Sequence, residues 1–404
     1  MARMRRPTLV LALALALSLA APATAAAPQL AQRLARALVV RDVSPARTGA
    51  VAFDLSTGTS VFARNATRSL APASNEKLPV TFAALEELGP TYTIETDVVG
   101  TGTLEGSVWR GNVFLQGHGD PTLSTAGLRA LALQVRATGI RRISGSVLGD
   151  ESYFDSRRTA PGWKPSFYIE ESPPLSALSV DRGRFHGGVS RVPALGAAMA
   201  FAEALRRAGV GVAGGVKVGV TPAETSELAT IESPSLAAIL RYMDHESDNF
   251  TAELLLKQLG AVEKDAGTTS AGAAAVRDTL AQNAVPLAGV RIVDGSGLSV
   301  LDRLTARAVV AILRAAWEDA TIRPTFVAAL PVAGVNGTLD DRLRSPPARG
   351  NVFAKTGTTA DASALSGYVG RRYVFSVLNN GRPLCLWCAR RAQDRFVSVL
   401  AAAQ

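Results

Sequence analysis

The stretch that decides the fold reads Pro72-Ala73-Ser74-Asn75-Glu76-Lys77-Leu78. Apolar residues then recur at helical spacing until Gly89 and Pro90 end the pattern. Ser74 therefore lies at the N-terminus of a predicted helix, in which Pro79 favours a kink or a tighter first turn. A serine and a lysine three residues apart lie on one face of such a helix, so an amine comes within reach of a hydroxyl.

Two further short motifs, Ser247-Asp248-Asn249 and Lys355-Thr356-Gly357-Thr358, follow Ser74-Asn75-Glu76-Lys77 along the chain. Each motif alone has an ordinary structural explanation. The serine fits a helix N-cap, the second motif fits exposed polar residues after a helix, and the lysine fits the protected edge of a sheet. The three motifs in this order, however, indicate an acyl-transfer site with a serine nucleophile.

The residue types of these motifs supply the parts that acyl transfer needs. Ser74 is the expected nucleophile and Lys77 the expected base, provided that burial or a nearby positive charge such as Lys355 lowers the Lys77 pKa. Ser247 is placed to relay the proton to the leaving amine. The Asn249 amide is suited to hold the substrate backbone.

The third motif supplies the other side of the site. Lys355 and Thr356, on an expected edge strand, suit a terminal carboxylate, and Gly357 lets that strand approach a ligand closely. The backbone N–H groups of Ser74 and Thr358 are the expected oxyanion hole. Farther along, Asp294 and Ser296 belong to a glycine-rich turn that we expect to shape the site from beneath.

The N-terminus is typical of an exported protein. Arg3, Arg5 and Arg6 precede an apolar run at residues 9–21, and the small residues 23–25 suit a signal peptidase. The run is shorter than the roughly 20 residues that span a bilayer. We therefore predict a signal peptide at residues 1–25 and a mature chain outside the cytoplasm.

Composition narrows the partners. The chain has 404 residues, 47% of them hydrophobic, and a net charge of +9. Its positive charges are scattered, with no basic run interleaved with aromatics, so nucleic-acid binding is a poor explanation and attraction to an anionic cell wall a better one. His118, His186 and His245 lack metal-ligand spacing, and we expect no metal or other cofactor. Cys385 and Cys388 could close a small disulfide in an oxidising compartment.

The organisation of the chain predicts an α/β (α+β) fold. Helical patterns, including one at residues 235–259 and a terminal one at residues 393–403, flank strand patterns near the C-terminus, which indicates a helix, sheet and helix sandwich. Residues 91–225 differ, because short strands and glycines dominate there. We therefore expect a discontinuous catalytic domain, residues 26–90 and 226–404, with a strand-rich inserted domain at residues 91–225.

Taken together, the motifs resemble the low-molecular-mass class C penicillin-binding proteins, which are D-alanyl-D-alanine carboxypeptidases that often double as endopeptidases. The resemblance covers nearly the whole mature chain. Besides the three motifs it includes residues 117–123, 149–155, 176–179 and 294–299. It departs at Val300, where the family usually has arginine.

The resemblance implies a β-lactamase-like transpeptidase domain with an insertion between the first two motifs. It implies that peptidoglycan stem peptides and β-lactams acylate Ser74. In relatives an aspartate of the inserted domain contacts the stem-peptide side chain, and Asp150 occupies the matching place. The balance of carboxypeptidase and endopeptidase activity, and the oligomeric state, stay open.

Two alternatives to a peptidase remain. A β-lactamase shares the first and third motifs but needs an efficient deacylating group, and no glutamate motif of that kind follows Ser247. A non-catalytic cell-wall binding protein of the same fold is the other alternative. The joint presence of the motif residues speaks against it.

Overall fold

A computed structural model describes residues 26–404 of the chain. Its centre is a five-stranded antiparallel sheet whose neighbouring strands come from both ends of the sequence. The strands, in sheet order, are β12 (Val352–Thr358), β13 (Ala362–Val369), β14 (Tyr373–Asn380), β1 (Thr48–Asp54) and β2 (Thr59–Arg64). Nearly every residue of β13 and β14 is buried, on both faces of the sheet, because helices cover both faces.

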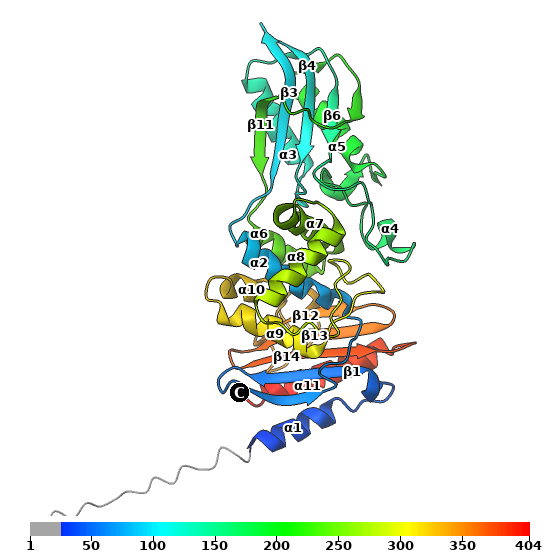
Figure 1. Ribbon diagram of the computed structural model, residues 1–404, viewed down its shortest axis with the longest axis vertical. Helices are drawn as coiled ribbons and strands as arrows, with labels where there is room; N and C mark the ends of the chain where they lie inside the picture. The colour runs from blue at the N-terminus through cyan, green and yellow to red at the C-terminus, as the bar shows by residue number, and fades with distance from the viewer. Residues whose placement is uncertain (1–25) are drawn as a thin grey trace, which may run out of the picture.

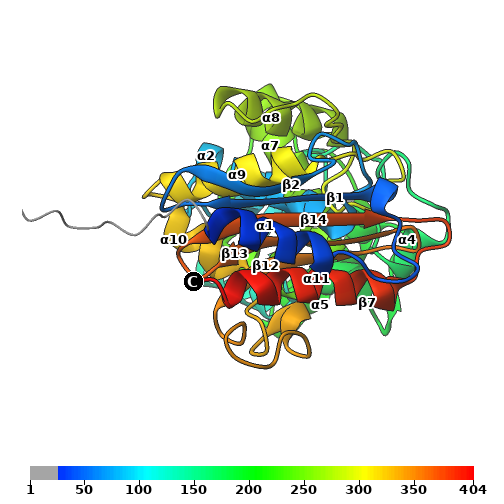
Figure 2. The ribbon, with the colours of Figure 1, turned by 90° about the horizontal axis from the view of Figure 1, so that it is seen from below.

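Two helices cover one face of this sheet. They are α1 (Ala26–Ala37) and α11 (Leu386–Ala401), which lie side by side in Figure 2 and share a core with the strands. Phe396 of α11 meets Phe62 of β2 edge to face, with ring centroids 5.5 Å apart. The first and last helices of residues 26–404 therefore pack against each other on this face of the sheet.

The other face carries a larger group of helices, seen above the sheet in Figure 1, whose buried side chains form one core with it. These helices are α2 (Lys77–Leu88), α6 (Leu236–Glu246), α7 (Asn249–Lys264), α8 (Thr269–Gln282), α9 (Ala306–Glu318) and α10 (Arg323–Ala329). Short 3-10 turns complete this part of the chain: η1 (Pro45–Arg47), η2 (Ala73–Glu76) and η4 (Gly337–Leu339). The predicted helix, sheet and helix sandwich is confirmed.

A second, seven-stranded sheet lies at the far end of the molecule in Figure 1. Its strands are β3 (Glu95–Glu105), β4 (Val108–Gly117), β5 (Arg142–Ile143), β6 (Val147–Asp150), β9 (Gly211–Val212), β10 (Val216–Val218) and β11 (Ser226–Glu232). Helices α3 (Thr125–Ala137) and α5 (Pro193–Arg207) pack on it and form a separate core. The smaller elements are α4 (Phe167–Glu170), η3 (Asp181–Gly183), β7 (Arg184–Phe185) and β8 (Gly188–Val189).

The predicted boundary at residue 225 falls directly before β11, which begins at Ser226. Strand β11 pairs antiparallel with β3, with Thr230 opposite Asp97, so it belongs to the second sheet. The chain returns to the larger group of helices on the first sheet only at Leu236, where α6 begins. We propose that the two sheets mark two domains, with the inserted one running from about β3 to the end of β11.

The helix predicted over residues 235–259 is two helices instead. Ser247 adopts a left-handed conformation, with φ of 57°, which ends α6. Asp248 then caps α7, because its side chain accepts a hydrogen bond from the Thr251 N–H. Apolar periodicity continues across this break and therefore concealed it.

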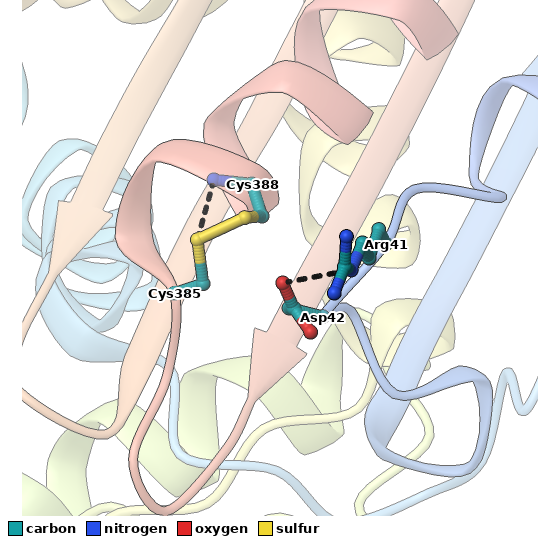
Figure 3. The surroundings of a disulfide bond; sticks show 4 residues. All are labelled: Arg41, Asp42, Cys385 and Cys388. Atoms are coloured by element: carbon teal, nitrogen blue, oxygen red, sulfur yellow. Dashed lines mark hydrogen bonds and ion pairs between the residues drawn. A yellow bond between two sulfur atoms is a disulfide. The ribbon is translucent and has the colours of Figure 1, made fainter.

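The terminal helix begins earlier than predicted, at Leu386. Cys385 caps it, and a disulfide joins Cys385 to Cys388 within its first turn (Figure 3). The signal-peptide prediction falls on residues 1–25, outside the described residues. Among residues 26–404, every helix is too short or too polar to cross a bilayer.

The two-domain proposal makes a prediction about Phe201, which α5 buries completely in the core of the second sheet. Phe201→Ala should destabilise that core by roughly 3–5 kcal/mol through lost contacts and a cavity. Amide hydrogen exchange should then rise in β3 and β4 but not in β12 to β14. An equal rise in both sheets would contradict the proposal.

Candidate active site

The three motifs of the sequence meet in one cleft of about 430 Å³, between the larger group of helices and the edge strand β12. Motif residues that line this cleft are Ser74, Ser247, Asn249, Thr356, Gly357 and Thr358. The local backbone brings them there. Ser74 lies in the tight turn η2 that precedes α2, as the position of Pro79 suggested, and Asn249 is the first residue of α7.

The turn at Ser74 is held against β12 by direct contacts. The Asn75 side chain donates to the Lys355 carbonyl at 2.9 Å. A Cβ atom on Gly357 would lie only 3.0 Å from the Ser74 nitrogen, so a side chain there would push the strand away from the turn. Ala73, just before the nucleophile candidate, has a left-handed φ of 48°, which costs a non-glycine residue about 1–2 kcal/mol.

Lys77 is the most constrained group of the site, with 0% of its surface exposed. Its Nζ lies 3.2 Å from Ser74 Oγ, 2.9 Å from Asn249 Oδ1 and 2.8 Å from the Ser296 carbonyl oxygen. Burial lowers the Lys77 pKa, and the charge of surrounding carboxylates such as Asp248 only partly opposes this. The amine is thus close to the hydroxyl and less basic than an exposed lysine.

Lys355 holds the second serine. Its Nζ donates to Ser247 Oγ at 2.8 Å and to the Thr356 carbonyl at 3.1 Å. Burial, followed by the charge of Lys77, lowers the pKa of Lys355 to about 7, against the attraction of Asp244. The sequence assigned the lowering of the Lys77 pKa to burial or to Lys355; in the structure burial is the largest cause of the lowered pKa of both lysines.

A layer of buried acids lies beneath Lys77. Glu253 Oε1 accepts the N–H groups of Gly295 and Ser296, at 3.0 and 2.9 Å, and so holds the turn that presents the Ser296 carbonyl. Burial, reinforced by the charge of Asp294, raises the Glu253 pKa to about 8. Burial likewise raises the pKa of Glu76 well above its usual range. With a pKa of about 8, Glu253 retains its proton near neutral pH.

The inserted segment reaches this site through three polar contacts that the sequence did not indicate. Trp163 Nε1 donates to Asp294 at 2.8 Å, and Asn249 Nδ2 donates to the Glu171 carbonyl at 3.0 Å. Arg182 donates to Asp248 at 3.0 Å. Asp248, the middle residue of its motif, therefore caps α7 and binds the insertion.

Asp150 is the one predicted site residue that the structure does not bring to the cleft. It lies at the end of β6, is 1% exposed, and accepts hydrogen bonds from the Ser152 and Thr221 N–H groups. Burial alone would raise its pKa, but these hydrogen bonds outweigh burial and lower it. The carboxylate is thus bound by Ser152 of the following loop and by Thr221, which is distant in sequence. Its contact with a substrate side chain stays a prediction.

A sequence model of the D-Ala-D-Ala carboxypeptidase 3 (S13) family matches residues 30–198 and 189–402, nearly the whole described chain. The chain belongs to this family. The class of protein expected from the motifs is therefore confirmed.

Individual relatives agree with this family assignment. The chain is 34% identical to a D-alanyl-D-alanine carboxypeptidase of Actinomadura sp. (strain R39), over 83% of this chain and 78% of the relative. Its fold matches the crystal structure of penicillin binding protein 4 from Haemophilus influenzae with a TM-score of 0.79 at 21% identity, covering 91% and 98% of the two chains. That protein has also been solved with a novel β-lactam, which matches with a TM-score of 0.74 at 20% identity and covers 91% and 98% of the chains.

The buried acids predict an unusual pH dependence of stability. Because the folded state raises the Glu253 pKa from 4.5 to about 8, the stability that this proton contributes is full below about pH 4.5 and is lost as the pH rises through about 8. Glu253→Gln keeps the acceptor oxygen but removes the titration. The melting temperature of the variant, relative to wild type, should rise by several degrees between about pH 5 and about pH 9.

The matched control is Glu227→Gln, which alters an exposed carboxylate on β11. Its melting temperature should follow that of the wild type across the same pH range. A constant difference between Glu253→Gln and wild type at every pH would show that Glu253 does not hold a proton in the folded protein.

Proposed function

We propose that this chain is an exported serine-type D-Ala-D-Ala carboxypeptidase that acts on peptidoglycan stem peptides through an acyl-enzyme on Ser74. The observation that carries the proposal is the contact of the buried Lys77 amine with Ser74 Oγ at 3.2 Å. Membership of the S13 family supports the reaction class. The signal-peptide pattern in residues 1–25 supports export.

The contacts of Lys77 explain how it acts as a base. A neutral amine has two N–H donors and one lone pair. Asn249 Oδ1 and the Ser296 carbonyl accept the two N–H groups, at 2.9 and 2.8 Å. The lone pair is then directed to the remaining neighbour, Ser74 Oγ, and receives its proton as the oxygen attacks the carbonyl of the penultimate D-alanine.

The rest of the cleft completes acylation. The negative charge on the carbonyl oxygen is stabilised by the backbone N–H groups of Ser74 and Thr358. As the C–N bond breaks, Ser247 passes a proton to the leaving nitrogen and is replenished from the protonated lysines, with Lys355 holding its Oγ at 2.8 Å. Lys355 and Thr356 bind the terminal carboxylate of the departing D-alanine.

Deacylation uses the same groups in reverse. Water gives one proton to Lys77 while its oxygen attacks the ester, and Ser74 Oγ recovers a proton as the C–O bond breaks. A β-lactam acylates Ser74 in the same way, but its leaving nitrogen stays attached to the acyl group and hinders water. We therefore expect β-lactams to inhibit this chain.

The proposal is tested by D-alanine release from a stem pentapeptide. Ser74→Ala should lower the rate at least ~10³-fold, since it removes the nucleophile. Ser60→Ala, an exposed serine of β2, is the matched control and should retain the wild-type rate.

Equal release of D-alanine by Ser74→Ala and wild type would contradict the mechanism. Many turnovers of nitrocefin by wild type, without release of D-alanine, would instead show a β-lactamase. Failure of fluorescent penicillin to label the wild type would indicate a non-catalytic binding protein.

A further inference from the structure

A strongly basic groove lies on the face of the first sheet opposite the larger group of helices. It has a volume of about 750 Å³ and runs between α1 and α11, which Figure 2 shows in front of the sheet. Two aspartates line it, Asp341 and Asp394. The arginines that line it are Arg33, Arg36, Arg342, Arg390, Arg391 and Arg395.

Most of these arginines have no acidic partner among residues 26–404. Only Arg342 forms an ion pair, with Asp394 at 2.6 Å. Arg391 lies over the ring of Trp387, 5.3 Å from its centroid, and Trp387 is 67% exposed. Like charges concentrated in this way repel one another, so an anionic ligand would relieve a cost that the fold now bears.

The groove adjoins the active-site cleft. Asp341, Arg342 and Arg390 line both. Arg390 Nη2 also lies 3.4 Å from the hydroxyl of Thr358, the last residue of β12. The groove thus begins at the third motif, where the proposed function places the terminal carboxylate of the substrate.

That terminal carboxylate belongs to the leaving group. In a stem pentapeptide the leaving group is a single D-alanine, which ends within the cleft. In cross-linked peptidoglycan the leaving group is a whole second stem peptide, which continues past the cleft and carries further carboxylates. The groove lies next to the place of the leaving group and is positively charged. It therefore matches a leaving stem peptide in both position and charge.

We propose that the groove between α1 and α11 is a binding subsite for the carboxylates of the leaving stem peptide of a cross-linked substrate. The proposal rests on the proposed function. Guanidinium groups bind carboxylates through paired, charge-assisted hydrogen bonds, and Arg36, Arg391 and Arg395 are exposed for this. The groove is concave, so a curved peptide fits it better than a flat lipid surface does.

The first turns of α11 carry several of the residues that line the groove. A disulfide links Cys385 to Cys388 across the first turn (Figure 3). Trp387 lies between these two cysteines in the sequence. Arg390 and Arg391 follow within the next turn of the same helix. The aromatic ring and the guanidinium groups thus lie on the same helix.

The test compares a cross-linked muropeptide dimer with a monomeric pentapeptide. The double variant Arg391→Glu/Arg395→Glu should lower kcat/KM for the dimer at least about tenfold more than for the pentapeptide, chiefly by raising KM. Added salt should raise the wild-type KM for the dimer and affect the variant less. The matched control, Arg206→Glu/Arg207→Glu, reverses two exposed arginines on α5 and should leave the ratio of the two substrates unchanged.

Equal losses on dimer and pentapeptide would overturn the subsite. So would a charge-dependent affinity for polyphosphate or phosphatidylglycerol vesicles in the absence of any preference for the dimer. If wild type releases nothing from either substrate, the proposed function fails instead. The subsite is then decided by calorimetry, since Ser74→Ala must bind the dimer more tightly than the pentapeptide for the proposal to stand.

Discussion

The site is organised around one lysine amine held out of water. Lys77 is fully buried, and a buried amine needs an acceptor for each N–H that it keeps. Asn249 and the Ser296 carbonyl supply two acceptors, and the third neighbour is Ser74 Oγ. Each comes from a different part of the chain. The packing of these segments around Lys77 therefore does two things. It buries the amine, which lowers its pKa, and it directs the amine to the Ser74 hydroxyl.

The surroundings of Lys77 are maintained by groups that are themselves tightly packed. The turn that carries Ser296 includes Gly297, where a Cβ atom would lie 1.9 Å from the Ala73 carbonyl oxygen. Glu253 holds this turn from below, and Trp163 of the inserted segment binds Asp294 within it. The inserted segment thus contacts the floor of the cleft directly. A basic groove extends the same cleft on its other side, toward α11.

The sequence predicted the parts of this site that depend on local pattern. The tight helix start at Ser74 follows from apolar spacing and Pro79. The edge strand that carries Lys355 follows from the strand patterns near the C-terminus. The break at Ser247 was not predicted, because the apolar face of α6 continues into α7 and a left-handed serine leaves no periodic signal. The burial of Asp150 was not predicted either, since its partner Thr221 is distant in sequence.

The most direct measurement is peptide mapping by mass spectrometry after reaction with benzylpenicillin. The account predicts one covalent penicilloyl adduct on the peptide that contains Ser74, and its strong reduction in Lys77→Ala, which lacks the base. An adduct on Ser247 or on another serine would contradict the account. An undiminished rate of adduct formation at Ser74 in the absence of the Lys77 amine would contradict it equally.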